Sequence, residues 1–416
     1  MNQRVDQLRT RSAWIIDGIR SPRGRGKPGG ALSSIHPQQL LAQVLESLRA
    51  RVGFDPSQID DVVIGSGSGE GEHGMDIGRM AVLDAGWDVE APGVSLNRFC
   101  GSGQQAANFA AMGVVSGHQD LVVAGGIESM SRLAPSRLGL HAGNSHLLER
   151  HPIVPQGIAA DLLATLEKID RQTVDAFAVE SQRRAALAQD EGRFDRSIVP
   201  IRHLDGTLAL DRDEHPRPGT TRDDLAGLRP SFAELGTRAL DGFDQSFDDM
   251  CRSVYPGVGR IDHVHHAGNS SGVVDGASAM LVASDEAVAA HGLRPRARLL
   301  MSAVVGAEPV VMLSAPAPAS RRCLERAGMQ IDDIDLWEIN EAFAVVPIKT
   351  MRDLDLDPER VNVNGGAIAL GHPIGASGVM LIETALDELE RRDLTTALVT
   401  MCTGGGMATA SIIERV

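Results

Sequence analysis

Cys100 is the first of four polar residues whose types and surroundings could do chemistry. It lies in SLNRFCGSGQQAANFAAM, after a short apolar run and just before Ala-rich residues that favour a helix. Unpaired backbone N–H groups and the helix dipole at such a turn favour an anion, so the thiolate would be stabilised and could act as a nucleophile. A small buried hydrophobe is the alternative, because most free cysteines are of that kind.

His372, in NGGAIALGHPIGASG, could supply the base for such a nucleophile. A base beside a thiol removes its proton, and the resulting ion pair would keep the thiolate populated near neutral pH. The glycines around His372 allow tight turns and close backbone approach. A histidine in a surface loop is the alternative interpretation.

Cys402 and Asn340 each end an apolar run that is typical of a strand. Cys402 in TMCTGGGMATA is followed by three glycines, and such a turn can present a side chain and bare N–H groups to a ligand. Asn340 in LWEINEAFAVV has Glu341 beside it as a candidate supporting partner. The structural alternatives are a buried cysteine and, for Asn340, a helix cap.

The elements that would position these residues occur twice in the chain. Residues 41–65 and 320–342 each predict an apolar-periodic helix followed by a strand, with QIDDV in the first and QIDDI in the second. Residues 99–126 and 371–406 share a second order: a turn of small residues, a helix, a polar link, a buried strand and glycines. This duplication predicts a layered α/β fold. A pseudo-twofold arrangement would then bring the two helix starts, one with the thiol and one with the imidazole, together at the centre.

The stretch between the two copies, residues 130–273, has a different character. It contains several Pro and Gly breaks and two long helical segments near 156–168 and 172–191. We interpret it as an inserted loop domain with substrate contacts, because insertions into a scaffold commonly carry them. The predicted domains are an amino-terminal half, an insertion and a carboxy-terminal half, with bounds 1–129 (completed by about 274–295), 130–273 and 296–416.

Composition and charge narrow the function classes. With 416 residues, 43% hydrophobic and 23% charged, the chain is typical of a soluble globular protein of roughly two or three domains. No apolar run approaches the ~20 residues of a membrane-spanning helix, so no membrane is expected as a partner. Residues 1–11 resemble a polar extension and no secretory signal is recognised, so the four widely spaced cysteines predict reduced thiols and a cytoplasmic location.

A net charge of -15 argues against nucleic acid as a partner, whereas an anionic small molecule would need local cations.

Four segments together resemble a known family. NRFCGSG, NEAFA, GHPIGASG and CTGGG, in this order and with these separations, are closely similar to the motifs of the thiolase family, the acyl-CoA acetyltransferases. GGIESMSR, RPGTTRDDLAGLRPSF and AGNSSGVVDGAS also match, so the resemblance covers nearly the whole chain. It implies a thiolase-like duplicated layered αβαβα fold with an inserted loop domain.

The resemblance also implies a role for each of these polar residues. Cys100 would be the nucleophile that becomes acylated, His372 its base, and Cys402 the acid/base for the substrate's α-carbon. Asn340 would hold a water that joins His372 in one oxyanion hole, and the backbone N–H groups of Cys100 and Gly404 would form the other.

For the ligand, the resemblance implies coenzyme A as a co-substrate, no permanently bound cofactor and no metal. The segment with Arg217 and Arg222 would lie over the nucleotide, and Ser271 would contact the pantetheine arm. Family members are homodimers or homotetramers, so the partners expected are acyl-CoA, CoA and further copies of this chain.

The reaction implied is CoA-dependent thiolytic cleavage of 3-ketoacyl-CoA, with ping-pong kinetics. Alternatives are an acetyltransferase that forms acetoacetyl-CoA, a ketoacyl synthase and a non-catalytic acyl-CoA binding protein. Arg98 and Phe99 in NRFCGSG, and Pro155, Gln156 and Gly157 in place of a His-Met-Gly of short-chain members, favour 3-ketoacyl-CoA breakdown. VVMLSAP (residues 310–316) also departs from the family pattern, and we expect an acyl tunnel for chains longer than acetoacetyl.

Three further motifs have less support. GEGEHG (residues 69–74) fits a dinucleotide-binding pattern, but its glutamates would face a pyrophosphate and no convincing helix follows. DHVHHAGN gathers three histidines without a matching set of metal ligands nearby. Cys100 and Cys402 lack the C-x-x-C spacing of a dedicated redox pair.

Overall fold

The computed structural model of this chain describes residues 11–133, 139–240 and 243–416. The predicted polar extension therefore lies, apart from Arg11, outside the described residues. The strands are β1 Trp14–Arg20, β2 Gly24–Arg25, β3 Asp61–Gly65, β4 Val94–Leu96, β5 Leu121–Ser129, β6 Ile201–Arg202, β7 Leu208–Leu210, β8 Val274–Ala283, β9 Ala297–Gly306, β10 Leu336–Ile339, β11 Thr396–Thr403 and β12 Met407–Arg415.

The helices fall into a scaffold set and an insertion set. The scaffold set is α2 Pro37–Val52, α3 Ile77–Asp84, α4 Ser102–Val115, α11 Asp285–His291, α12 Pro316–Ala327, α13 Val345–Leu354, α14 Ala367–Leu370 and α15 Ser377–Arg392. The insertion set is α5 Ser145–Arg150, α6 Gln156–Leu166, α7 Arg171–Asp190, α8 Arg222–Ala226, α9 Ala233–Gly236 and α10 Phe247–Val254. The two long helices predicted in the insertion are confirmed as α6 and α7.

The sheet repeats one strand order in both halves of the chain. A ten-stranded sheet runs β10-β11-β12-β9-β1-β8-β5-β3-β4, with β2 paired to β8. In the first half, β3 is parallel to β5, and β8 is antiparallel to both β5 and β1. In the second half, β10 is parallel to β11, and β12 is antiparallel to both β11 and β9. The predicted duplication of a layered α/β unit is therefore confirmed.

The register of the repeat differs from the one that the letters QIDDV and QIDDI indicate. Asp60 precedes β3 and its Oδ2 accepts hydrogen bonds from the N–H groups of Asp120 and Leu121, at the start of β5. Asp335 precedes β10 and its Oδ2 accepts from the N–H groups of Thr395 and Thr396, at the start of β11. The equivalent residues are Asp60 and Asp335, so the identical letters lie three positions out of register. What repeats is a carboxylate that satisfies the first donors of the neighbouring strand.

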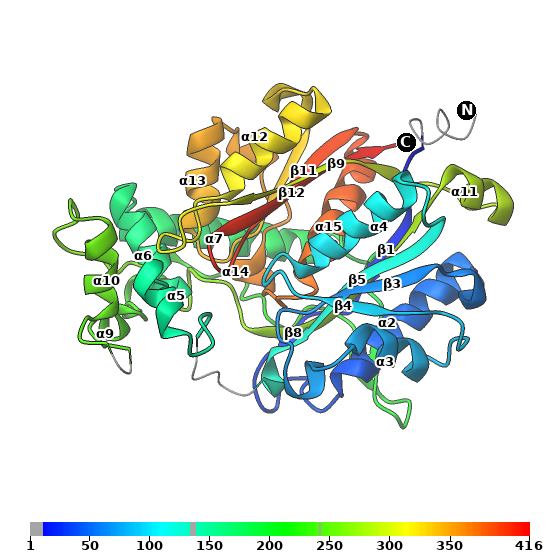
Figure 1. The fold of residues 1–416 in the computed structure, drawn as a ribbon, viewed down its shortest axis with the longest axis horizontal. Helices are drawn as coiled ribbons and strands as arrows, with labels where there is room; N and C mark the ends of the chain where they lie inside the picture. The colour runs from blue at the N-terminus through cyan, green and yellow to red at the C-terminus, as the bar shows by residue number, and fades with distance from the viewer. Residues whose placement is uncertain (1–10, 134–138, 241–242) are drawn as a thin grey trace.

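Helices alternate with the two half-sheets to give five layers, as Figure 1 shows. One hydrophobic cluster lies between each group of helices and the strands that it covers. Helices α2 and α3 cover the outer face of the first half-sheet, and α12 covers the outer face of the second. Helices α4 and α15 lie in the middle layer, where their apolar residues contact strands of both halves. This is the αβαβα order that the family resemblance implies.

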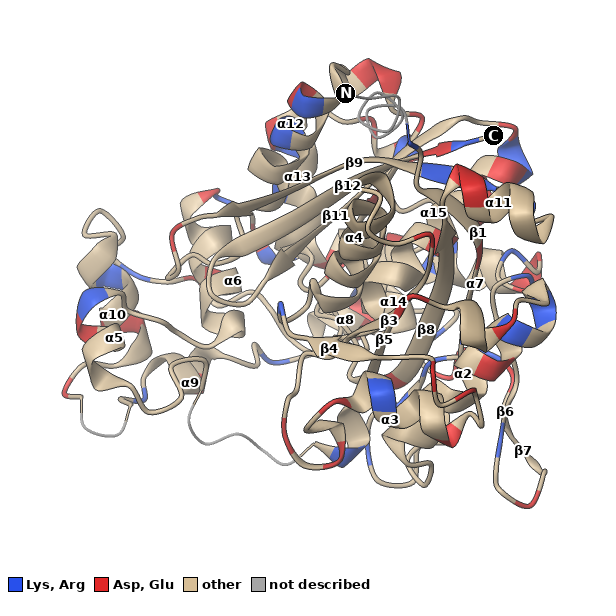
Figure 2. Cartoon of the chain, turned by 45° about the vertical axis from the view of Figure 1, so that its right-hand side comes forward, with Lys and Arg blue, Asp and Glu red and all other residues tan. Residues whose placement is uncertain are grey.

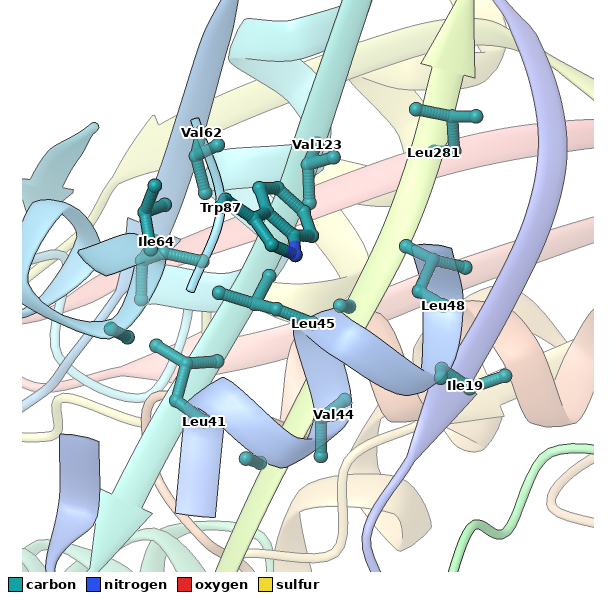
Figure 3. Packing of buried hydrophobic residues seen from close by; sticks show 14 of the residues in the cluster. Ile19, Leu41, Val44, Leu45, Leu48, Val62, Ile64, Trp87, Val123 and Leu281 are labelled. Atoms are coloured by element: carbon teal, nitrogen blue, oxygen red, sulfur yellow. The ribbon is translucent and has the colours of Figure 1, made fainter. Parts of the chain in front are cut away.

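Helix α2 shows how a periodic sequence fixes an outer layer. Leu41, Leu45 and Leu48 recur at helical spacing and are completely buried. In Figure 3 this face of α2 lies against strand residues such as Val62, and the Trp87 ring belongs to the same cluster. Gly53 ends the helix with φ at 81°, a left-handed conformation that glycine adopts without steric cost.

The two central helices approach each other at their amino termini through glycines. A Cβ on Gly103 of α4 would lie 2.5 Å from the carbonyl oxygen of Gly375, just before α15. A Cβ on Gly378 of α15 would lie 2.0 Å from the backbone nitrogen of Gln104. Only residues without a side chain allow this contact, which brings together the turns that carry the predicted nucleophile and base.

The inserted segment contacts both halves of the scaffold. Helices α6 and α10 share a hydrophobic cluster with residues 310–313 and α13 of the second half. Val199 and Ile201 join the outer cluster of the first half. Asp213 makes a bidentate buried ion pair with Arg20 at the end of β1, with N–O distances of 2.7 and 2.8 Å. The bounds 130–273 remain a prediction, and the segment within them does not pack as one separate body.

Charged residues lie mainly on the outer elements, as Figure 2 shows for the exposed sides of α2, α10 and α12. Helix α4 in the middle layer has none, because its sequence is SGQQAANFAAMGVV. Among the described residues, no helix combines the length and the apolar character that crossing a membrane requires.

Candidate active site

Cys100 lies in a tight turn between β4 and α4. Phe99 before it has φ at 49°, a left-handed conformation that is uncommon for a residue with a side chain. The Cys100 side chain is buried, with 4% of its surface exposed. A Cβ on Gly101 would lie 2.8 Å from Cγ2 of Thr403, and one on Gly404 would lie 3.1 Å from the Phe99 ring. The turn therefore packs directly on the end of β11, which contains Cys402, and on Gly404 just after it.

Three hydrogen-bond donors surround the Cys100 sulfur. The backbone N–H groups of Cys100 and Gly404 both favour its charged form. The Nε2 atom of Gln156, at the start of α6, lies 4.0 Å from the sulfur. A site with two backbone N–H groups and a sulfur at one point can bind an oxygen that gains negative charge when the sulfur attacks its carbon.

Burial nevertheless keeps both thiols protonated at rest. Desolvation raises the pKa of Cys100 to about 11, and the hydrogen bond from Gln156 only partly offsets this. Desolvation also raises the pKa of Cys402, and the nearby Cys100 raises it further. This result differs from the sequence-based expectation of a thiolate populated near neutral pH, because the helix terminus stabilises the anion less than burial destabilises it.

His372 is held as a neutral imidazole with a defined tautomer. Its Nδ1 lies 2.6 Å from Oγ of Ser377, and that hydroxyl donates its single hydrogen to the carbonyl of Pro373 at 2.9 Å. The hydroxyl therefore accepts from Nδ1–H, and this hydrogen-bond assignment leaves Nε2 unprotonated, with its lone pair as an acceptor. Burial lowers the pKa of His372 to about 4, with a further contribution from the Arg23 guanidinium. A neutral imidazole of this kind can act as a base.

Asn340 faces His372 from the end of β10. Its Nδ2 lies 3.4 Å from Nε2 of His372, and its backbone N–H donates to Thr400 of β11. Its Oδ1 is buried and has no hydrogen-bond partner among the described residues. A cavity of about 10 Å³, the space of one water, borders Asn340, Arg23, Glu338 and Ser377.

Glu341 supports the neighbouring loop rather than the histidine. Its Oε2 accepts from Ser181 Oγ at 2.6 Å and from the N–H of Ile368 at 3.1 Å, and its Oε1 accepts from Asn362 at 3.0 Å. These contacts tie the residue that follows β10 to the segment that runs through α14 and on to His372. Glu341 therefore supports this loop, and among the described residues its side chain makes no hydrogen bond to Asn340 or to the imidazole.

The structure gathers the predicted residues into two adjoining groups. Cys100, Cys402 and Gly404 form one, and His372 with Asn340 forms the other. Phe343 and Ile368, which flank the second group, share a hydrophobic cluster with Cys402. The contact between the amino termini of α4 and α15 joins the groups at the centre of the molecule.

The predicted CoA contacts lie on segments beside this centre. The carbonyl oxygen of Gly272 accepts from the N–H of His372 at 2.9 Å, so the neighbouring Ser271 is adjacent to the site. Arg217 lies on an exposed loop and Arg222 is the exposed first residue of α8, which packs through Leu225 against Gly268. Neither arginine makes an ion pair within the described ranges, so both guanidinium groups are available to an anionic ligand.

The histidines of DHVHHAGN have a structural explanation. Nδ1 of His263 and Nδ1 of His265 each lie 2.8 Å from the Asp161 carboxylate, and Nε2 of His266 lies 2.9 Å from Asp175. They join this segment to α6 and α7. In the part of the chain that the structure describes, no group of His, Cys, Asp and Glu is arranged to hold a metal ion.

The glycine-rich motif at residues 69–74 forms a 3-10 turn, Gly71–His73, rather than the start of a nucleotide-binding helix. Glu72 forms an ion pair with Arg132, and His73 Nε2 accepts from the N–H of Ser129 at 2.8 Å. Both contacts fix the end of β5.

Three residues of the site make contacts that the sequence does not predict, and one of them, Gln156, is notable there only as a departure from the pattern of short-chain members. Ser377 orients His372, and Gln156 contacts the Cys100 sulfur. Glu128 at the end of β5 accepts from the N–H groups of Gly67 and Gly375 at 2.8 and 2.9 Å, and so connects the two halves. Burial raises the pKa of Glu128 to about 7. Ser377 lies five residues after a histidine, at the start of a helix, and this spacing could have identified it. The contacts of Gln156 and Glu128 join segments that are far apart in the chain, so no local sequence pattern predicts them.

Comparison with known proteins gives a consistent result over the whole chain. The family model described as "Thiolase, N-terminal domain" matches residues 13–239, and "Thiolase, C-terminal domain" matches residues 293–415. The chain is 41% identical to the 3-oxoadipyl-CoA/3-oxo-5,6-dehydrosuberyl-CoA thiolase of Escherichia coli, over 98% of this chain and 100% of that protein. It is 38% identical to the steroid 3-ketoacyl-CoA thiolase FadA6 of Mycobacterium tuberculosis, over 97% and 94%. The crystal structure of a Bacillus anthracis acetyl-CoA acetyltransferase superposes with a TM-score of 0.82 at 34% identity, over 97% of this chain and 99% of that one.

Proposed function

The chain belongs to the thiolase family of acyltransferases, and from this premise we propose that it cleaves 3-ketoacyl-CoA with free CoA through an acyl-Cys100 intermediate. The products would be acetyl-CoA and a shortened acyl-CoA. Two observations carry the proposal: the Cys100 sulfur lies beside two backbone N–H groups, and a neutral, oriented imidazole lies just before α15, whose amino terminus contacts that of α4.

In the first half-reaction Cys100 attacks C3 of the substrate, and Nε2 of His372 receives the thiol proton. Because burial disfavours each charge alone, proton transfer and attack should occur together rather than from a preformed thiolate. The N–H groups of Cys100 and Gly404 then hold the former ketone oxygen. Each such donor contributes about 3 kcal/mol to transition-state stabilisation.

Cleavage of the C2–C3 bond leaves the acetyl-CoA enolate, whose oxygen needs a second donor set. The newly protonated Nε2 of His372, with a water held by Asn340, would supply it. The buried Oδ1 of Asn340 that lacks a partner and the adjoining cavity support a bound water there. Cys402 then protonates C2, a role that suits a thiol whose pKa is raised, since it keeps its proton until a strong base forms.

In the second half-reaction, free CoA gives its proton to the Cys402 thiolate and attacks the acyl group on Cys100. Arg217 and Arg222 are proposed to receive the CoA phosphates, and Ser271 to contact the pantetheine arm. With a net charge of -15, the chain repels anions at long range, so these two exposed cations would have to act locally.

The degradative direction and acyl chains longer than acetoacetyl are our proposal for the substrate class. The relatives from Escherichia coli and Mycobacterium tuberculosis are named for substrates of this kind. Apolar residues that share a hydrophobic cluster with Cys402, among them Met312, Leu313 and Phe343, are proposed to contact such a chain. Formation of acetoacetyl-CoA from two acetyl-CoA molecules is the reverse reaction of the same site.

A homodimer or homotetramer is proposed as the functional assembly. Strand β4 is the edge of the sheet in the first half, and the neighbouring α4 exposes Phe109, Met112 and Val115 at helical spacing. An exposed sheet edge beside an apolar helix face favours association with a second copy.

The decisive experiment measures thiolysis of defined 3-ketoacyl-CoAs of increasing chain length, with mass analysis of Cys100 in the absence of CoA. We expect an acyl adduct on Cys100, turnover of the longer substrates and no turnover after Cys100→Ala. Activity confined to acetoacetyl-CoA would reject the chain-length proposal, and turnover by the Cys100→Ala variant would reject the mechanism. Malonyl-dependent condensation in the same preparation would instead indicate a ketoacyl synthase.

A further inference from the structure

Gln156 contacts the reacting sulfur with a side chain that makes no other hydrogen bond to the described residues. Its Nε2 lies 4.0 Å from Sγ of Cys100, within the range of a hydrogen bond to sulfur. The two residues are 56 positions apart, so the contact depends on how the inserted segment docks on the scaffold.

The position of Gln156 is fixed by a buried helix. It is the first residue of α6, whose next residues, Gly157 to Ala164, are all buried. The carbonyl of Pro155 accepts from the N–H groups of Ile158 and Ala159 at 2.9 and 3.1 Å, which closes the first turn. A Cβ on Gly157 would lie 2.2 Å from the Phe232 ring, so this ring presses directly on the helix backbone. The backbone that carries the Gln156 amide is thus fixed by rigid surroundings rather than by a mobile loop.

Resting on the proposed function, we infer that Gln156 is a third hydrogen-bond donor to the Cys100 sulfur and acts each time this sulfur becomes negative. That happens twice in a turnover. In acylation the sulfur loses its proton to His372 as the C–S bond forms. In deacylation the CoA sulfur forms its bond to the acyl carbon, the bond to Cys100 breaks, its electron pair returns to Sγ, and the imidazolium of His372 returns the proton.

Electrostatics supports this contact geometry. Among the groups around Cys100, the hydrogen bond from Gln156 is the largest influence that lowers the thiol pKa, and it opposes desolvation. The backbone donors of Cys100 and Gly404 are needed for the substrate oxygen during turnover. An amide side chain that donates to sulfur leaves these two N–H groups free for that oxygen.

The test compares Gln156→Met, Gln156→Glu and the control Gln43→Met. Methionine keeps the length of the side chain without an N–H donor, and glutamate places an acceptor at the same point. Gln43 lies on α2, where its amide contacts Arg202 on the outer surface. The rate of carbamidomethylation of Cys100 by iodoacetamide is followed across pH by mass analysis of the peptide that contains it.

We expect slower alkylation in Gln156→Met, slower still in Gln156→Glu, and no change in Gln43→Met. Each unit of increase in thiol pKa lowers the thiolate fraction tenfold but raises its nucleophilicity, so the net loss in rate is about three- to fourfold. Unchanged alkylation in both Gln156 variants, with melting temperatures equal to that of the unmodified protein, would overturn the inference.

Failure of this inference is distinguishable from failure of the proposed function. Alkylation needs no substrate, so it reports on the sulfur even if no 3-ketoacyl-CoA is cleaved. If thiolysis occurs, the transfer of the acyl group from Cys100 to CoA in a single turnover should be slower in Gln156→Met. An equal transfer rate would remove Gln156 from the second half-reaction.

Discussion

Burial keeps both reacting groups of the site neutral at rest, and this determines how the rate should depend on pH. His372 can accept a proton only while it is neutral, and its pKa is lowered to about 4. We therefore expect kcat/KM for a 3-ketoacyl-CoA to stay constant on acidification until the pH approaches about 4. An unperturbed histidine would give an acid limb near about 6.5.

Glu128 provides the control for this profile, because its own pKa is raised to about 7. If kcat/KM falls near neutral pH and this fall disappears in Glu128→Gln, the group that titrates is the Glu128 carboxyl. A fall that persists near pH 6.5 in this variant would show that His372 titrates normally, and the account of its burial would be wrong.

Ser377 should matter for catalysis through the tautomer of His372. Ser377→Ala removes the acceptor of Nδ1–H, so the imidazole loses both its orientation and its preference for a free Nε2. Loss of a partner for a buried polar group costs about 1–3 kcal/mol, and we expect kcat to fall by roughly 10- to 100-fold. Ser320→Ala is the matched control, because Ser320 is also buried and donates to the carbonyl four residues earlier, in α12. Equal effects of the two substitutions on kcat would refute the orienting role.

At the scale of elements, the contact between α4 and α15 positions the site. Gly378→Ala would place a Cβ 2.0 Å from the backbone nitrogen of Gln104, and a backbone cannot move as a side chain can. Overpacking of this kind costs about 1–3 kcal/mol, so we expect a lower melting temperature together with lower kcat, as the turns with Cys100 and His372 separate.

Gly113→Ala tests whether this effect is specific to the helix contact. Gly113 also lies in α4, but its Cβ would meet Oε1 of Gln119, the end of a flexible side chain. If that side chain moves aside, alanine gains up to about 1 kcal/mol from helix propensity. Thermal melts and kcat should therefore separate the two variants, and equal losses in both would show that the contact has no special role.

For the whole molecule, two buried neutral histidines should make stability depend on acid. The pKa values of His73 and His372 are both lowered to about 4, chiefly by desolvation. Between about pH 6.5 and 4 the unfolded chain binds protons at these sites and the native protein does not, so acidification favours unfolding. Each site can lose roughly 3 kcal/mol over this range.

The melting temperature should fall over that range, and His73→Gln should reduce the fall. A glutamine side chain still offers an oxygen to the N–H of Ser129 but takes up no proton. His118→Gln is the control, because His118 is exposed. If both variants lose stability as steeply as the unmodified protein, desolvation of His73 is not a source of the dependence.

The sequence by itself determined the duplicated α/β unit, its alternation of helices and apolar strands, and the places of Cys100, Asn340, His372 and Cys402 at the ends of strands or starts of helices. These features are local, since each depends on the periodicity of a short segment and on the glycines that follow it. The family resemblance added roles for these residues.

Tertiary structure decided the register of the repeat, the two-sided packing of the insertion, the contact of Gln156 with Cys100 and the protonation of the site. The matching letters QIDDV and QIDDI suggest one alignment of the two halves. The hydrogen bonds to the starts of β5 and β11 give another, in which Asp60 corresponds to Asp335. A helix start alone predicts a thiolate, yet the pKa of Cys100 is raised because surrounding segments from distant parts of the chain exclude water. Desolvation and long-range contacts are properties of the packed molecule, and no short stretch of residues encodes them.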